Sequence, residues 1–381
     1  MLRQILTLLF SRGSILVSTF LVGVILARGM TVEERGLYAY IVSLVAILVP
    51  LSELGLRQYT ILKVNEGKVD LSIVKSSSQI FFISFLCISI GSSLILENYV
   101  LVLLLVLLTV IMNYTQGLFL ATSNYKYFAL INHVKAIVHI LIVGCYFFWA
   151  DSISSIHAVL SLSVALFFCS ILSTFVLRAN NLLYNSSYRY SKLETIKLSY
   201  HHCIGFFLVN FSYKSVVFCY SYNSGSDLGY IAILMTLSEL IWQVPMAFST
   251  WLLGNKNNPI NINKSILFVG FYASVATIIL TLFGDYFIAF VYGSKYSGTM
   301  DYIRLFSLYI VCVAVFKVIY MYEAKRNRNL AISLPLACGC LMILIISYFN
   351  NFSSFMVPLL FSSLYLFIIV KWIVKDRNVQ I

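Results

Sequence analysis

Long runs of apolar residues, separated by short polar clusters, fill almost the whole chain. A helix needs roughly 20 mostly apolar residues to cross about 30 Å of hydrocarbon. The runs are continuous and do not alternate every second residue, as the strands of a membrane barrel do, so the pattern predicts helices. Twelve spans are predicted: Ile5–Ala27, Leu37–Arg57, Ser78–Leu96, Tyr99–Leu120, Phe128–Phe148, Ser155–Val176, Tyr200–Tyr222, Gly229–Leu253, Ser265–Phe283, Tyr302–Tyr322, Ala331–Tyr348 and Ser354–Val374.

The composition agrees with an all-α integral membrane protein. Of the 381 residues, 60% are hydrophobic and only 10% are charged, whereas about a quarter of the residues of a soluble domain are charged. The longest connections, about Leu177–Ser199 and Gly284–Asp301, are too short to hold a soluble domain. We therefore expect a protein that works within the membrane and carries no appended enzyme.

The basic residues divide unevenly between the two sides of the predicted topology. The chain has 26 Lys and Arg against 14 Asp and Glu, a net charge of +12. Cytoplasmic loops of membrane proteins hold the excess of Lys and Arg, so the richer side, on which both termini lie, is predicted to be cytoplasmic. It holds 19 bases: Arg3, Arg57, Lys63, Lys68, Lys75, Lys126, Lys135, Arg178, Arg189, Lys192, Lys197, Lys256, Lys264, Lys325, Arg326, Arg328, Lys371, Lys375 and Arg377. The other side holds three: Arg28, Arg35 and Lys295.

An internal repeat relates the two halves of the chain. The connection Leu177–Ser199 leaves six spans on each side, which predicts an N-terminal lobe over residues 1–185 and a C-terminal lobe over residues 186–381. At an offset of 193 residues three identical pairs align: Gly36 with Gly229, Ala39 with Ala232, and Leu44 with Leu237. Transporters built from parallel repeats bind substrate between the halves and rock one half against the other. The alternative is a repeat that has lost this motion.

Four segments resemble, in order and spacing, the polysaccharide-exporting flippases of the MOP superfamily. The first, Ile25–Gln58, has an Ala-Arg pair, an acidic turn, Gly-x-Tyr-Ala and, further on, Leu-Gly-Leu. The others are Gly117–Leu141, Leu228–Leu252 and Leu282–Val311, the last with a Tyr-Gly-x-x-Tyr core from Tyr292 to Tyr296. Within the superfamily the chain is most similar to Wzx-type O-antigen flippases.

This resemblance implies two six-helix lobes in a V around a central cavity. It implies a bacterial inner-membrane flippase that moves undecaprenyl-pyrophosphate-linked oligosaccharide from the cytoplasmic to the periplasmic leaflet by alternating access. The expected partners are that lipid-linked substrate, membrane lipids, an O-antigen polymerase and a chain-length regulator; no cofactor, metal or nucleic acid is expected. Many relatives carry an acid in the seventh span, but this chain has Phe211–Ser215 there and no acid before Asp227, so their ion site does not transfer.

Two bases within the spans are the main candidates for contact with a pyrophosphate or sugar. Arg12 lies about a third of the way into the first span, beside Ser11, Ser14 and Ser18. Lys214 lies in the middle of the seventh span. A charge at the bilayer centre is costly by at least a few kcal/mol, so each side chain should face a wet cavity, or else pair with a carboxylate.

Two further bases lie near the predicted cytoplasmic ends of spans. Arg57 could capture pyrophosphate at the mouth of the cavity, or could simply reflect the positive charge of that side. Lys317 is a weaker substrate candidate, since its stem is long enough to snorkel to the interface. Arg304 is expected to anchor to lipid headgroups.

Two acids within the spans are candidates for coupling to a proton or sodium ion. Glu239 lies about 15 Å into the eighth span at 1.5 Å per residue, and Glu53 lies nearer the cytoplasmic end of the second. A structural ion pair, for example between Glu239 and Lys214, is the alternative. These acids also keep open a second function, a cation-coupled multidrug or metabolite exporter of the related MATE branch, although such an exporter predicts a cavity dominated by carboxylates.

Overall fold

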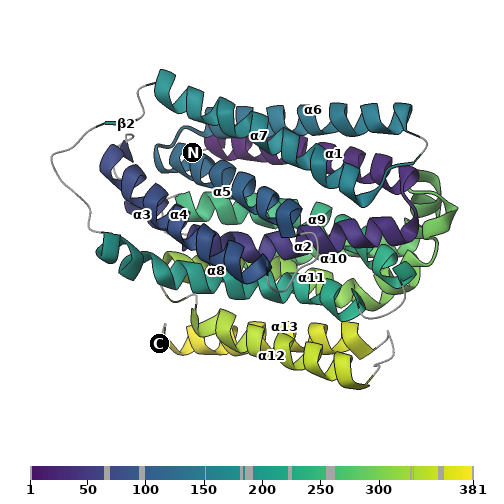
Figure 1. Cartoon of the computed structure of the whole chain (residues 1–381). Coiled ribbons are helices and arrows are strands. Elements are labelled where there is room, and N and C mark those ends of the chain that lie inside the picture. Colours follow the sequence, from purple (N-terminus) through teal and green to yellow (C-terminus); the bar gives the residue numbers. More distant parts are fainter. Residues whose placement is uncertain are drawn as a thin grey trace.

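The computed structural model describes residues 2–63, 69–93, 99–150, 152–180, 183–184, 192–221, 225–254, 262–326, 328, 330–350 and 356–379. Within these ranges the side chains of residues 2–12, 14 and 15, and of some residues near the gaps, lie outside the description. The described part is almost entirely helical. Figure 1 shows the helices as one bundle, with α6 and α7 along one side, α12 and α13 along the opposite side, and both marked chain ends toward the same end of the bundle.

The N-terminal lobe is built from six long helices and one short one. They are α1 (Leu2–Gly29), α2 (Val32–Glu53), the short α3 (Leu56–Lys63), α4 (Leu71–Ser93), α5 (Tyr99–Ala121), α6 (Tyr125–Trp149) and α7 (Ser155–Ala179). The strands β1 (Val69–Asp70) and β2 (Leu183–Tyr184) form a two-residue parallel pair. Most of α1 packs on α6, while α2 crosses to the second half of the chain and packs on α8 and α9.

The C-terminal lobe also has six long helices. They are α8 (Lys192–Ser221), α9 (Gly225–Gly254), α10 (Ile262–Val291), α11 (Thr299–Lys325), α12 (Leu330–Asn350) and α13 (Met356–Val379), with a short 3-10 helix, η1 (Ser294–Tyr296), between α10 and α11. The predicted boundary after residue 185 falls at the edge of residues 185–191, which lie outside the described part.

Eleven of the described helices are long and apolar enough to cross a membrane. The helix α1 adds a shorter apolar stretch, Leu16–Gly29, within its 28 residues. The prediction of twelve helices agrees with this arrangement. Large apolar side chains point outward along α10, where Phe271 is 73% exposed and Phe290 is 81% exposed. Such a surface is unfavourable in water and suits a helix that faces lipid.

The predicted second span, Leu37–Arg57, is too long at its end. The structure ends α2 at Glu53, and Leu54 and Gly55 both adopt left-handed backbone conformations, with φ of 47° and 70°. A side chain at Gly55 would collide with the start of α8, because a Cβ there would lie 2.6 Å from the Cys203 backbone nitrogen. Glycine therefore allows a tight corner against α8, and Arg57 belongs to α3 beyond that corner.

Two other helices are longer than the apolar runs from which they were predicted. The helix α8 begins at Lys192, eight residues before the predicted Tyr200, and α10 continues to Val291, eight residues past the predicted Phe283. Hydropathy marks the part of a helix that lies in hydrocarbon, whereas the backbone hydrogen bonds continue into the polar interface. The long connection predicted over Gly284–Asp301 is therefore shorter than expected.

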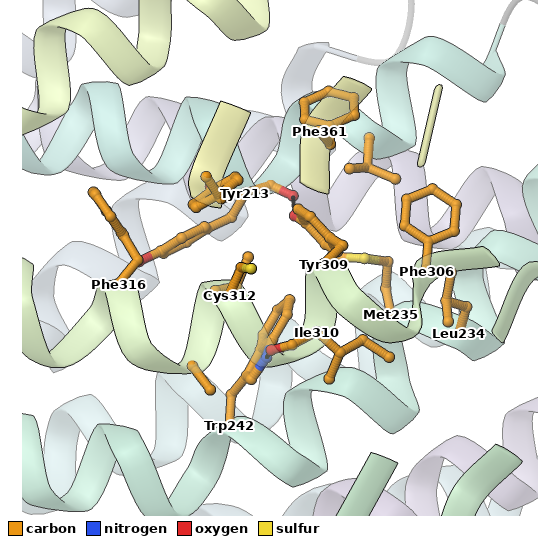
Figure 2. Packing of buried hydrophobic residues seen from close by; sticks show 14 of the residues in the cluster. Tyr213, Leu234, Met235, Trp242, Phe306, Tyr309, Ile310, Cys312, Phe316 and Phe361 are labelled. Atoms are coloured by element: carbon orange, nitrogen blue, oxygen red, sulfur yellow. Dashed lines mark hydrogen bonds between the residues drawn. The ribbon is translucent and has the colours of Figure 1, made fainter. Parts of the chain in front are cut away.

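Each lobe has its own hydrophobic core. One core draws all its buried members from residues between Val22 and Leu177, and the other draws nearly all of its members from the second half of the chain. Figure 2 shows the second core around Trp242 and Tyr309, in which the Trp242 indole donates a hydrogen bond of 2.9 Å to the Ile310 carbonyl. Phe248 and Met321 pack against both cores.

Candidate substrate cavity

A cavity of about 640 Å³ lies between the two lobes. Its lining follows α2 from Arg35 to Glu53, a distance of about 27 Å at 1.5 Å per residue, and continues to Arg57 and Ile61 on α3. The N-terminal lobe also contributes residues of α1, α5, α6 and α7, and the C-terminal lobe contributes residues of α8, α9 and α11. We call the end near Arg35 the base-poor end and the end near Arg57 the base-rich end.

Charged and amide side chains line this cavity, with cations in excess. The described lining includes the bases Arg35, Arg57, Lys135 and Lys214 and the acids Glu53 and Glu239. Five amides supply further hydrogen-bonding groups: Gln58, Asn113, Gln116, Asn132 and Asn210. An anion, or a polar group rich in hydroxyls, would therefore find complementary partners in this cavity.

Lys214 and Glu239 form an ion pair in the C-terminal lobe. The Lys214 Nζ lies 2.7 Å from the Glu239 Oε1, and 39% of the Glu239 side chain is exposed against 15% of the Lys214 side chain. Both residues line the cavity, as does Asn210, one turn before Lys214 on α8. The predicted pairing of these two charges is thereby confirmed, and it leaves the carboxylate open to the cavity.

Arg35 reaches from the N-terminal lobe to the C-terminal lobe. Its Nη2 donates a hydrogen bond of 2.9 Å to the Thr236 hydroxyl, and its guanidinium lies over the Tyr38 ring. Arg35 is only 4% exposed, and its Nε has no hydrogen-bond partner among the described residues. Arg35 was predicted as a loop charge, and this was wrong, because Arg35 lies in the first turn of α2 and is buried between the lobes.

Lys317 does not snorkel outward from α11. Its Nζ lies 4.0 Å from the centroid of the Tyr213 ring and 4.9 Å from that of Trp242. Figure 2 shows these two aromatic residues in the core of the C-terminal lobe, next to Tyr309. Lys317 is absent from the described lining of the cavity, but its charge acts on Glu239. It therefore belongs to the electrostatic surroundings of the ion pair.

Glu53 and Arg57 meet at the corner between α2 and α3. The two charges interact and the Asn113 amide lies close to the Glu53 carboxylate, while the described residues contain no ion pair between Glu53 and Arg57 within 4 Å. Burial lowers the pKa of Arg57 and the Glu53 carboxylate opposes this effect, although a guanidinium stays protonated in proteins. The Arg57 stem packs on Gly117, where a Cβ would lie 2.7 Å from the Arg57 Cγ.

Lys135 was predicted as a loop charge, but it lies in the cavity. It lies ten residues into α6 and lines the cavity with Asn132 and His139. The sequence does indicate this position, because Lys135 lies seven residues inside the predicted span Phe128–Phe148. Arg35 offered no such signal, since it lies before the predicted start of its span.

The Arg12 side chain lies outside the described part of the structure, so its role stays a prediction. Of the serines predicted beside it, Ser18 lines the cavity, as does its neighbour Thr19. Arg304, predicted as a headgroup anchor, is exposed and pairs with Asp285 at 3.0 Å and with Asp301 at 3.7 Å.

Two bases at the base-poor end, one from each lobe, bond the backbone of the opposite lobe. From the N-terminal lobe, Arg28 donates hydrogen bonds of 2.9 Å and 2.6 Å to the Val291 and Phe290 carbonyls at the end of α10. From the C-terminal lobe, Lys295 donates hydrogen bonds of 2.5 Å and 3.4 Å to the Met30 and Arg28 carbonyls at the end of α1. Each cation thus caps a helix C-terminus of the opposite lobe, where the helix dipole is negative.

The repeat glycines bring the lobes into backbone contact at the same end. Gly36 of α2 and Gly229 of α9, which the repeat pairs, pack against each other, and a Cβ at Gly36 would lie 3.0 Å from the Gly229 nitrogen. A Cβ at Gly229 would collide with the Val32 carbonyl oxygen. The tyrosines of the Tyr-Gly-x-x-Tyr segment lie here too. Burial raises the pKa of Tyr292 and Tyr296 to about 12, and both rings lie within reach of the Arg35 charge.

All eight cysteines are free thiols. Among the residues that the structure describes, no group of three or more His, Cys, Asp or Glu side chains is placed to hold a metal ion.

No protein-family model matches the chain, and no curated protein matches it in sequence. Solved structures, in contrast, match it from end to end. An outward-facing multidrug resistance MATE family transporter of the MOP superfamily gives a TM-score of 0.69 at 13% identity, over 98% of this chain and 94% of that one. A variant of the MATE transporter VcmN from Vibrio cholerae gives 0.62 at 8% identity, over 100% of this chain and 96% of that one.

The chain has the fold of MATE transporters. A MOP superfamily transporter from Pyrococcus furiosus also matches, with a TM-score of 0.59 at 11% identity, over 99% of this chain and 96% of that one. That transporter is described as having a binding pocket of reverse polarity, which suggests a different function for it. At these identities the likeness is one of fold, so the chemistry must be argued from the cavity of this chain.

Proposed function

We propose that this protein is a flippase that moves a lipid-linked oligosaccharide, held through an anionic pyrophosphate, from one leaflet of the inner membrane to the other. The observation that supports this function is the excess of cations in the cavity, where the described lining has four bases and two acids. The resemblance of four segments to Wzx-type flippases agrees with it.

The energetic problem for such a substrate lies in its charge. Moving a charged group through hydrocarbon costs at least a few kcal/mol, and ammonium and guanidinium groups offset that cost by hydrogen-bonding phosphate oxygens. Lys214 and Arg35 would contact the pyrophosphate in the middle of the cavity and toward the base-poor end, and Arg57 would receive it at the base-rich end. Arg12 joins this set as a prediction from the sequence.

The size of the cavity fits the polar head of the substrate. Pockets of about 300–1,000 Å³ enclose ligands of drug size, and the cavity here has about 640 Å³. A pyrophosphate with its first sugars fits this volume, whereas a long isoprenoid tail would stay in the lipid. The amides Asn113, Gln116 and Asn132 would hydrogen-bond sugar hydroxyls.

Alternating access needs one end of the cavity to close while the other admits substrate. The contacts of Arg28, Lys295 and the repeat glycines keep the lobes together at the base-poor end. We expect these contacts to break when the cavity opens on that side. If the base-poor end faces the periplasm, as the distribution of Lys and Arg predicts, the structure corresponds to a state closed toward the periplasm.

The second candidate is a cation-coupled exporter. The multidrug MATE transporters among the matching structures support it through their fold, and the acids Glu239 and Glu53 in the cavity would be its coupling sites. Glu53 suits this role better, because it is 6% exposed and its Oε1 has no partner among the described residues. The cation excess favours the flippase.

A complementation experiment tests the proposal. In a bacterium whose surface polysaccharide requires this protein, Lys214→Ala should lower the polysaccharide at least about tenfold, because a missing contact to a charged phosphate costs roughly 1.5–3 kcal/mol. Arg12→Ala should do the same, while Lys197→Ala, which removes an exposed base at the base-rich end, should have no effect. Immunoblots would show that each variant is present at wild-type abundance. Undiminished polysaccharide in Lys214→Ala, or altered drug resistance instead, would count against the flippase.

A further inference from the structure

The Lys214–Glu239 ion pair has a feature that a purely structural pair does not need. Its carboxylate side chain is 39% exposed, although both residues lie between the lobes and line the cavity. A pair that only joined the two helices would not need a carboxylate that opens into the cavity. This pair instead presents an anion, already bound to a lysine, to the space that the substrate would enter.

The charges of three cations act on the Glu239 carboxylate, and one of these cations contacts it. Lys214 contacts it at 2.7 Å, and the charges of Lys317 and Arg35 also act on it. Arg35 of α2 hydrogen-bonds Thr236 of α9. Thr236 lies three residues before Glu239, so the two residues share one face of α9. These surroundings are unfavourable for a coupling cation, which would need several oxygen ligands and no positive neighbours.

Arg35 supplies an independent sign of an incomplete site. It is 4% exposed, and its Nε–H has no acceptor among the described residues. A buried donor without an acceptor is unfavourable by about 1–3 kcal/mol, so the site is better satisfied when a further acceptor enters. A phosphate oxygen is such an acceptor.

We propose that Glu239 is a resident counter-ion: it occupies the anion subsite of Lys214 and Arg35 when the cavity is empty, and the substrate pyrophosphate displaces it. This inference rests on the proposed function and assigns a specificity role to Glu239. Because the carboxylate must be displaced, weak monoanions would not enter the subsite, whereas a pyrophosphate, with more charge and more oxygens, would. When the substrate leaves, the carboxylate returns to Lys214 and prevents the anion from rebinding.

The subsite also connects the two lobes. Arg35 belongs to α2 of the N-terminal lobe, whereas Lys214 and Glu239 belong to α8 and α9 of the C-terminal lobe. A pyrophosphate held by both Lys214 and Arg35 would therefore bridge the lobes, and a return of Glu239 to Lys214 would release that bridge.

The test measures the binding of farnesyl pyrophosphate, an isoprenoid pyrophosphate without sugar, to the purified full-length protein in detergent. Glu239→Gln removes the competing charge and should bind the probe about tenfold more tightly, which corresponds to ~1.4 kcal/mol. Lys214→Ala should bind it at least about tenfold more weakly. Asp285→Asn is the matched control, since it also removes one acid from an ion pair but lies 58% exposed beside Arg304; its affinity should not change.

A second measurement separates this role from a structural one. In cells Glu239→Gln should export less surface polysaccharide in spite of its tighter binding, because release becomes slow. Glu239→Asp, which keeps the charge, should resemble the wild type in both measurements, and thermal unfolding of each variant would show that it is folded. A structural pair would predict weaker binding and weaker export together.

The outcomes distinguish the inference from the function on which it rests. Equal binding of the probe by the wild type and by Lys214→Ala would contradict the proposed function itself. Weaker binding by Lys214→Ala, combined with unchanged or weaker binding by Glu239→Gln, would overturn only the counter-ion role. Loss of ion-gradient dependence in Glu239→Gln at unchanged affinity would also overturn it and make Glu239 a coupling site.

Discussion

The base-poor and base-rich ends of the bundle use their charges in opposite ways. At the base-rich end many bases, among them Lys75, Lys126 and Lys197, are exposed. At the base-poor end Arg28, Arg35 and Lys295 all donate hydrogen bonds to the opposite lobe. The many bases at the base-rich end therefore indicate the expected orientation in the membrane. The few bases at the base-poor end instead join the two lobes.

The physical reason for this difference is the partner of each cation. An exposed lysine at the membrane surface is satisfied by water and lipid headgroups, so its position is loosely determined. Arg28 and Lys295 instead bond carbonyls that a helix leaves unpaired at its C-terminus, and these carbonyls occupy fixed positions. A rigid contact between two helix ends results, and it opens only when the lobes separate.

The largest expected effect comes from the backbone contact at the base-poor end. Gly229→Val places a side chain against the Val32 backbone, which cannot yield without moving α2. Overpacking of this kind costs about 1–3 kcal/mol or more, so we expect a lower melting temperature in detergent and nearly complete loss of export. Gly144→Val is the control, because a Cβ there meets nothing within 4 Å. Equal behaviour of the two variants would show that the lobes do not need this contact.

Removing the reciprocal caps should have an intermediate effect. The double variant Arg28→Ala with Lys295→Ala loses charge-assisted hydrogen bonds that, being exposed, contribute about 1 kcal/mol each. The base-poor end should open more often. A cysteine placed at the cavity residue Ala39, in a background without native cysteines, should then react several-fold faster with a membrane-impermeant maleimide from that side.

The matched control for the caps lies at the other end. Lys75→Ala with Lys197→Ala also removes two exposed bases but should leave the labelling rate unchanged. If this control opens the cavity as much as the loss of Arg28 and Lys295, net charge rather than the interlobe contacts controls access.

The smallest expected effect concerns the Thr236 hydroxyl. Thr236→Val removes the acceptor of Arg35 and should destabilise the contact between the lobes by about 1 kcal/mol, which moves the labelling rate at Ala39 in the same direction as loss of the caps. Ser43 aligns with Thr236 at the repeat offset of 193 residues, but among the residues that the structure describes it bonds only the Ala39 carbonyl of its own helix. Ser43→Ala should therefore leave the labelling rate unchanged. Because Ser43 bonds the carbonyl of Ala39 itself, this control is measured with the cysteine at Ala46, another cavity residue.

Hydropathy predicted most of the helices, because each apolar run must form a helix on its own to enter lipid. The apolar runs predicted the long helices, although α8 and α10 extend past them. The break after Glu53 could not be predicted in the same way. It depends on the close approach of α8 to Gly55, and the residues that meet there are about 150 positions apart in the chain.

The candidate site was predicted where a charge interrupts an apolar run. Lys214 and Glu239 were found for this reason, and their pairing was among the predicted alternatives. Arg35 was missed, because a base next to a predicted loop resembles any other loop charge. Its burial results from the helix α2 beginning at Val32, five residues before the predicted span, and from α9 crossing at that point.

The sequence by itself determined that this protein is a helical membrane protein with a few charges within its spans. Those properties follow from the free energy of transferring each segment into lipid, which depends on composition alone. Only the tertiary structure decided which charges meet. Lys214 and Glu239 are 25 residues apart and Arg35 and Thr236 are 201 apart, and their contact depends on how the helices rotate and pack, because a hydrogen bond needs its two atoms within about 3 Å.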